Sequence, residues 1–117
     1  MVEIKVKNYI SRGFSENDAK AISPILDECL KTKNSKIIID FKDVKYFTTL
    51  FFNLALTRYL ENMSVEEYES KIEIKNLSEV GLETYSHSYD NAVEYYSLSP
   101  KEKEERENRI SENTEMV

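Results

Sequence analysis

The chain has 117 residues and a mass of 13.7 kDa, enough for one domain with a single modest core. Its formal charge of −6 argues against nucleic-acid and anionic-membrane surfaces, and its two glycines exclude glycine-rich phosphate-binding loops. One cysteine, no signal-peptide pattern and no apolar run long enough to span a bilayer lead us to expect a cytoplasmic protein without internal disulfides.

The first predicted element is a strand over residues 2–7. Apolar and charged side chains alternate there, which is typical of a half-buried strand with Val2, Ile4 and Val6 facing inward. Gly13 follows in the connection, where we expect a turn with positive φ.

A helix is predicted to begin at Ser15 and to end near residues 31–34. Asp18 lies three residues after Ser15, which is the spacing of a capping box. Pro24 interrupts the helical pattern, so it either kinks this helix or begins a second one.

The central stretch, residues 36–62, is predicted to form a strand, a turn and a buried helix. Its three consecutive isoleucines make a continuous apolar run, which indicates a strand in the middle of the sheet that is covered on both faces. Thr48 or Thr49 stands where a helix N-cap is expected, and the helix is predicted to run from about residue 49 to residue 62. Three polar side chains recur at every fourth position and predict a narrow stripe facing water: Asn53, Thr57 and Glu61.

The last third of the chain begins with a polar link that contains a cap-like Ser64. An alternating strand over residues 71–75 and a helix capped by Ser78 are predicted to follow. Whether this helix breaks near residues 86–90 stays open. The final residues, 98–117, are densely charged and predict a flexible tail.

Strands and helices alternate along the chain, which predicts the α/β fold class. We expect a small, mainly parallel sheet of three to five strands with alternating helices, because parallel strands need crossover connections. The domain is expected to span residues 1–97, followed by the charged tail.

A resemblance rests on the central stretch, which reads Asp40-Phe41-x-x-Val44-x-x-Phe47-Thr48-Thr49-x-Phe51. This pattern resembles the strand-loop-helix signature of STAS-like domains, and most of all a small bacterial STAS-like family of unknown function related to anti-sigma-factor antagonists. Residues 11–12 and 74–78 fit the same pattern, so the resemblance covers roughly residues 1–97. It implies a non-catalytic regulatory module that binds another protein, with a histidine-kinase-like ATPase as the partner class.

Thr48 and Thr49 are the candidate phospho-switch and interaction loop. In phospho-regulated antagonists the turn reads Asp-Ser-Ser-Gly, and by position Thr49 stands at the phospho-acceptor while Thr48 replaces the Asp. A phosphate at a helix N-terminus would meet free N–H groups and the positive end of the helix dipole. The alternative is that one threonine is simply the N-cap, which contributes about 1 kcal/mol.

Asp40 and Asp43 are the candidate loop acids. They lie at the end of the central strand, where α/β proteins place ligands, and two acids suit Mg²⁺ or acid–base chemistry. The competing interpretation is that they accept hydrogen bonds from the turn's backbone, since no third ligand has an identifiable spacing. We therefore expect no metal and no cofactor. A small enzyme or nucleotide-binding module using both acids and His87, the only histidine, is the alternative from another functional class.

The last helix is rich in tyrosine, and spacing places Tyr85, Tyr89 and Tyr96 near one face. Tyrosine is favoured at protein interfaces, so these residues are the candidate interface for a partner or a second copy. Covering the domain's own core is the equal alternative. An adaptor or inhibitor encoded by a phage or mobile element is a further alternative within the protein-binding class.

Overall fold

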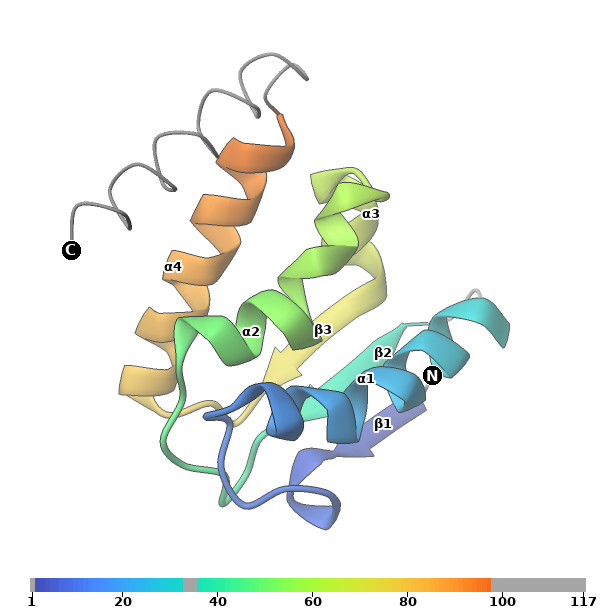
Figure 1. The fold of residues 1–117 in the computed structure, drawn as a ribbon. Helices are drawn as coiled ribbons and strands as arrows, with labels where there is room; N and C mark the ends of the chain where they lie inside the picture. The colour runs from blue at the N-terminus through green and yellow to red at the C-terminus, as the bar shows by residue number, and fades with distance from the viewer. Residues whose placement is uncertain (1, 33–35, 98–117) are drawn as a thin grey trace, which may run out of the picture.

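The computed structural model describes residues 2–32 and 36–97, so the predicted tail over residues 98–117 lies outside the described part. Strands and helices alternate, as the sequence predicts, and α3 is an additional helix in the polar link (Figure 1). The strands are β1 (Val2–Lys5), β2 (Ile37–Asp40) and β3 (Ile72–Lys75). The helices are α1 (Glu16–Thr32), α2 (Thr49–Ala55), α3 (Val65–Lys71) and α4 (Glu79–Tyr96), with 3-10 helices η1 (Val6–Asn8) and η2 (Thr57–Glu61).

The sheet is parallel and has the strand order β1-β2-β3, which confirms the α/β prediction at the lower end of the expected strand number. Residues paired across the three strands form rows, and successive rows point to opposite faces of the sheet because side chains alternate along each strand. The rows at Ile37 and Ile39 face inward and are almost wholly apolar. The rows at Ile38 and Asp40 face outward, where charged side chains from β1 and β3 flank them.

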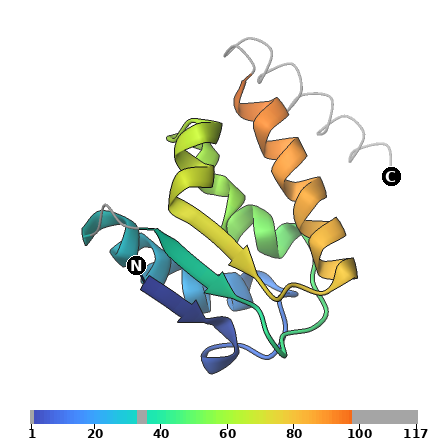
Figure 2. The ribbon, with the colours of Figure 1, turned by 180° about the vertical axis from the view of Figure 1, so that it is seen from behind.

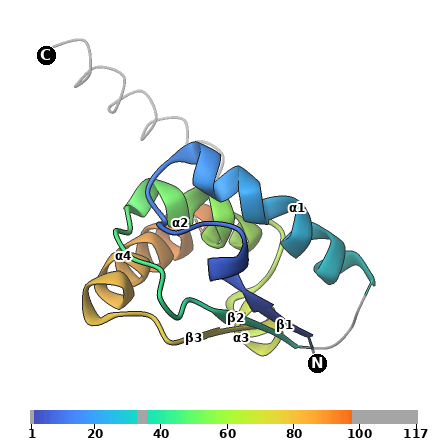
Figure 3. The same ribbon diagram turned by 90° about the horizontal axis from the view of Figure 1, so that it is seen from below.

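Three helices, α1, α2 and α4, lie on one face of the sheet. In Figure 2 the strands are in front and α1, α2 and α4 behind, and Figure 3 shows these three helices on the same side of the strands. The prediction that β2 is covered on both faces is therefore wrong, although β2 is the middle strand. Ile38 points to the outer face and is only half-buried; its row neighbours are Glu3 and Glu73.

The core between the sheet and the helices is dominated by phenylalanine. Phe41, Phe51 and Phe52 are at most 1% exposed, and each buried ring contributes roughly 2–3 kcal/mol. Phe47 stacks on Phe52 with ring centroids 5.3 Å apart and meets Phe41 edge-on at 5.5 Å. These rings come from the end of β2 and the start of α2, so the central stretch of the sequence also organises the core.

The predicted single helix over residues 49–62 is in fact two elements. α2 ends at Ala55, and Leu56 leaves the helical region with φ −125° and ψ −61° before η2 begins. Thr57, predicted to face water, is 1% exposed, and its hydroxyl lies 2.8 Å from the hydroxyl of Ser88 on α4. Ser88 also donates a hydrogen bond to Asn53. Asn53 and Glu61 are exposed, as predicted, so the water-facing stripe is wrong only at Thr57.

The remaining local predictions have mixed outcomes. The capping box is confirmed, because Ser15 Oγ accepts from the N–H of Asp18 while an Asp18 oxygen accepts from the N–H of Ser15. α1 continues through Pro24 as one helix, and α4 is unbroken. Gly13 does not have positive φ, so the turn prediction is wrong there.

Candidate functional site

The carboxyl end of the parallel sheet contains four of the residues that sequence reasoning singled out: Asp40, Asp43, Thr48 and Thr49. α1, α2 and α4 all begin at this end of the molecule, as Figure 1 shows. The connections leading into them run from β1 to α1, from β2 to α2 and from β3 to α4. Ligands and partners of α/β proteins commonly bind at such an edge, because loops from several strands meet there.

Phe47 holds the connection between β2 and α2 in place. The chain's two glycines lie at opposite edges of its ring: a Cβ on Gly13 would come within 2.6 Å of Phe47 Cδ1, and one on Gly81 within 2.8 Å of Cδ2. Glycine is therefore required at both positions by close approach and not by backbone conformation. The ring ties the starts of α1 and α4 to the loop between them.

Backbone hydrogen bonds hold the same loop against the segment before α1. Lys45 accepts from the N–H of Gly13 and donates to the carbonyl of Ser11, and Arg12 and Lys45 form an isolated parallel bridge. The N–H of Thr48 donates to the carbonyl of Gly13 at 2.9 Å. Two segments more than thirty residues apart thus form one surface.

Thr48 is the N-cap of α2. Its hydroxyl accepts from the N–H of Phe51 at 3.2 Å and donates to the carbonyl of Phe14, so both of its hydrogen-bonding roles are used. Thr49 is the first helical residue and is half-buried, and its side chain makes no hydrogen bond within the described residues. Of the two threonines, Thr49 is the one whose hydroxyl is not committed to the fold.

Large apolar side chains are exposed at this end of the molecule. All six that the described residues expose lie in the connections after the strands or in the first turns of the helices that follow. We call them the carboxyl-end surface: Tyr9, Phe14, Tyr46, Leu50, Val80 and Leu82. An apolar group of this kind, gathered at one end, is typical of a binding surface.

Tyr46 is the most exposed of these residues and is held in an unfavourable backbone conformation. Its side chain is 74% exposed and its φ is 60°. A bulky residue in the left-handed region costs about 1 kcal/mol, and exposure leaves little packing to offset that cost. Strain of this kind is concentrated at functional sites, so Tyr46 is a candidate functional residue that sequence reasoning missed.

Of the two loop acids, Asp40 is engaged by the fold while Asp43 lies exposed in the turn. Asp40 is 7% exposed, and its Oδ1 accepts from Asn76 Nδ2 and from the N–H of Lys42, both at 2.9 Å. The hydrogen bond from Asn76, followed by that from Lys42, holds the pKa of Asp40 below its usual range. Asp43 is exposed and has a φ of 65°, which suits a turn residue. Asp40 thus has the structural role that the sequence favoured.

His87 is exposed on α4 and lines none of the hollows that contain Asp40 or Asp43. Cys29, on α1, is a half-buried free thiol packed against the core. Over residues 2–32 and 36–97, no group of three His, Cys, Asp or Glu side chains is arranged to hold a metal ion. Asp40 and Asp43 line one hollow, but His87 is not brought together with them.

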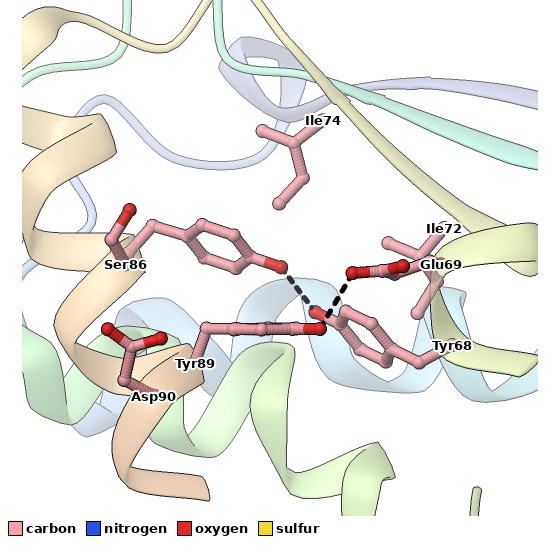
Figure 4. Close-up of a pocket in the computed structure, with 8 residues that line it drawn as sticks. Tyr68, Glu69, Ile72, Ile74, Ser86, Tyr89 and Asp90 are labelled. Carbon is pink, nitrogen blue, oxygen red and sulfur yellow. Dashed lines mark hydrogen bonds between the residues drawn. The ribbon is translucent and has the colours of Figure 1, made fainter. Parts of the chain in front are cut away.

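Tyr85 and Tyr89 of α4 line a separate hollow of about 250 Å³, between α3, β3 and α4 (Figure 4). Tyr85 and Tyr68 share a hydrogen bond of 2.9 Å, and Tyr89 donates to Glu69 at 2.8 Å. Burial, reinforced by the Glu69 carboxylate, raises the pKa of Tyr89 to about 12. Tyr96 lies further along α4 and is half-buried against the core.

These contacts show how the predicted interface tyrosines are used. The hydroxyls of Tyr85 and Tyr89 are engaged with α3, and all three side chains pack against the core. Sequence reasoning missed Tyr68, which lies in the predicted polar link and is 1% exposed. The sequence feature that could have identified Tyr68 is that it is an aromatic residue within a largely charged segment.

Comparison with protein families gives one match. A family described as a STAS-like domain of unknown function matches residues 18–82, which is more than half of the chain. The chain belongs to this family. The matched segment of this STAS-like domain contains β2, α2 and the connection between them, which includes Phe47. No curated protein and no solved structure matches the chain. Within the described residues, no helix is both long enough and apolar enough to cross a membrane.

Proposed function

We propose that this STAS-like domain is a non-catalytic regulatory module that acts by binding another protein through its carboxyl-end surface. One observation carries the proposal: the six exposed large apolar side chains of the described residues all lie at the end of the sheet where three connections meet. Solvation alone does not favour such a distribution, and a partner that covers this end would remove the apolar area from water. The strained and highly exposed Tyr46 in this surface supports the same interpretation.

The resemblance to anti-sigma-factor antagonists supports a histidine-kinase-like ATPase as the partner class and a cytoplasmic regulatory role. Thr49 is the proposed switch residue, because its hydroxyl makes no hydrogen bond within the described residues and it directly precedes the exposed Leu50. A phosphate on Thr49 would add charge beside an apolar contact and oppose docking. Thr48 is unsuitable, because modification would remove the cap of α2 and the bond to Phe14.

The test is affinity capture from native cytosol with tagged wild-type protein and a set of variants. Leu50 is 51% exposed, so Leu50→Asp should leave the fold intact and reduce recovery of the partner by at least about tenfold. Glu66→Ala, on exposed α3, is the matched control and should recover the partner at the wild-type level. Equal recovery by Leu50→Asp and wild type would contradict the proposal.

The switch is tested with two further variants. Thr49→Glu should lose the partner and Thr49→Ala should retain it, because only the first adds charge. Similar behaviour of the two variants would show that Thr49 acts through packing and would remove it from the proposal.

A further inference from the structure

Two adjoining hollows lie at the carboxyl end of the sheet. The first has a volume of about 470 Å³ and the second of about 610 Å³, and they share Lys7 and Asp43. The second hollow also contains Arg12, Lys45 and the exposed Tyr46, so it is continuous with the carboxyl-end surface.

The hollows are cationic, although the chain has a formal charge of −6. Three carboxylates line them, against six of the chain's sixteen lysines and arginines. The six cations are Lys5, Lys7, Arg12, Lys42, Lys45 and Lys75.

None of these six cations makes an ion pair within the described residues. By contrast, Lys20, Lys36, Arg58 and Lys71, which lie elsewhere, each have a carboxylate oxygen within 3.3 Å. Of the described lysines and arginines without an ion pair, all but Lys31, in the last turn of α1, therefore lie at the same end as the exposed apolar side chains. Like charges grouped in this way repel one another unless an anion is bound between them.

The three acids in the hollows offset only part of the charge of the six cations. Asp40 lies between Lys5 and Lys75 in one row of the sheet, yet its Oδ1 is engaged by Asn76 and the backbone of Lys42. Neither lysine lies within ion-pair distance of it. Both contribute to the low pKa of Asp40, which is the effect of a positive field at this position.

We infer that the carboxyl-end surface receives an acidic, amphipathic segment of a partner protein, whose carboxylates lie over the two hollows while its apolar side chains contact Tyr46 and Phe14. This inference rests on the proposed function and adds the chemistry of the partner. Arg12 lies 5.8 Å from the ring centre of Phe14, so cationic and aromatic groups are interleaved on this surface. Such a surface is complementary to a segment that carries both carboxylates and apolar groups.

A nucleic acid fits these observations less well than an acidic segment. A polynucleotide extends its charge beyond any single site, and it would meet an acidic surface outside the hollows. A short acidic segment keeps its charge within the cationic area. The confined size of the positive region thus favours a protein partner.

The experiment uses the full chain, isotopically labelled, and follows backbone amide signals during titration at low salt. The probe is a synthetic peptide with Glu and Leu on opposite faces of a helix, and the matched control replaces every Glu by Gln. Single-stranded oligothymidylate and inorganic pyrophosphate are the competing anions. Lys42→Glu/Lys45→Glu is the test variant and Lys20→Glu, on α1, is the charge-reversal control.

The acidic peptide should shift the amide signals of residues 5–7, 42–46 and 75–76 and should bind about tenfold more tightly than the Gln peptide. The double reversal should weaken its binding at least about tenfold, and Lys20→Glu should leave it within about twofold. Equal binding of both peptides, or tighter binding of oligothymidylate or pyrophosphate at these residues, would overturn the inference. An acidic peptide that does not bind, together with loss of capture by Leu50→Asp, would overturn the inference and leave the proposed function standing.

Discussion

The contact between Phe47 and the two glycines predicts that Gly13→Ala destabilises the domain. The added Cβ would lie 2.6 Å from Cδ1 and 2.9 Å from Cε1 of Phe47, and 3.0 Å from Phe51. Phe51 is fully buried and cannot move, and Phe47 cannot retreat in its own plane because Gly81 closes the opposite edge of the ring. The close contact can therefore be relieved only by moving well-packed side chains, which costs free energy.

The size of the effect follows from two opposing contributions. Overpacking in a well-filled site costs about 1–3 kcal/mol. A Gly-to-Ala change at a position that does not need positive φ stabilises the folded protein by about 0.4–1 kcal/mol, because it lowers the entropy of the unfolded chain. The free energy of unfolding should fall by about 1–2 kcal/mol, which corresponds to a loss of roughly 5–10 °C in Tm for a domain of this size.

The assay is urea unfolding followed by circular dichroism, with wild type, Gly13→Ala, Phe47→Leu and the double variant. Leucine lacks the ring edge that the new methyl group meets, so Gly13→Ala should cost much less in the Phe47→Leu background. A coupling energy of about 1 kcal/mol is expected. If Gly13→Ala proves neutral, or costs the same in both backgrounds, the reasoning about the clamped ring is refuted.

Three further predictions concern single residues. Ser88→Ala should lower the free energy of unfolding by about 1–2 kcal/mol, because buried Thr57 loses its 2.8 Å partner and Asn53 loses a donor; an unchanged urea midpoint would contradict this. Asp40 has a lowered pKa in the folded state, so its stabilising contribution is present above about pH 4 and is lost as the pH falls through the folded pKa. The free energy of unfolding should therefore depend less on pH in the acid range for Asp40→Asn than for wild type. Parallel pH profiles for the two proteins would contradict this prediction. Tyr46→Asn should be neutral or up to about 1 kcal/mol more stable, because Asn tolerates φ near 60°, while it weakens partner capture; a clear loss of stability would show that Tyr46 supports the fold.

The local predictions succeeded where the interactions are local. Ser15, Ser64 and Ser78 each accept a hydrogen bond from the N–H three residues later, so their roles can be read from neighbouring letters. The alternating patterns at β1 and β3 likewise predict which side chains face the helices. The order of strands and helices then requires parallel crossover connections, and the family resemblance rests on the same segments.

The wrong predictions concern partners that are distant in the chain. The periodicity of residues 49–62 fits one helix, but Thr57 meets Ser88 thirty-one residues away, and the chain departs from helix at Leu56. Three isoleucines in a row fit a strand covered on both faces, whereas here the helices cover only one face and Ile38 lies on the outer face beside charged neighbours. Periodicity reports what a segment can bury, and it does not report which segment covers it.

The sequence by itself determined the three strands, α1 and α4 with their serine caps, the α/β class and the family resemblance, because the patterns and caps depend on contacts between residues close together in the chain. The tertiary structure alone decided that Gly13 and Gly81 meet at Phe47, that α1, α2 and α4 lie on one face, and that the exposed apolar side chains and the six cations of the hollows share one end of the sheet. The physical reason is that a surface is defined by the segments that pack beside one another. The exposed apolar side chains and the six cations are spread along the chain from Lys5 to Leu82, and only the parallel sheet brings them together.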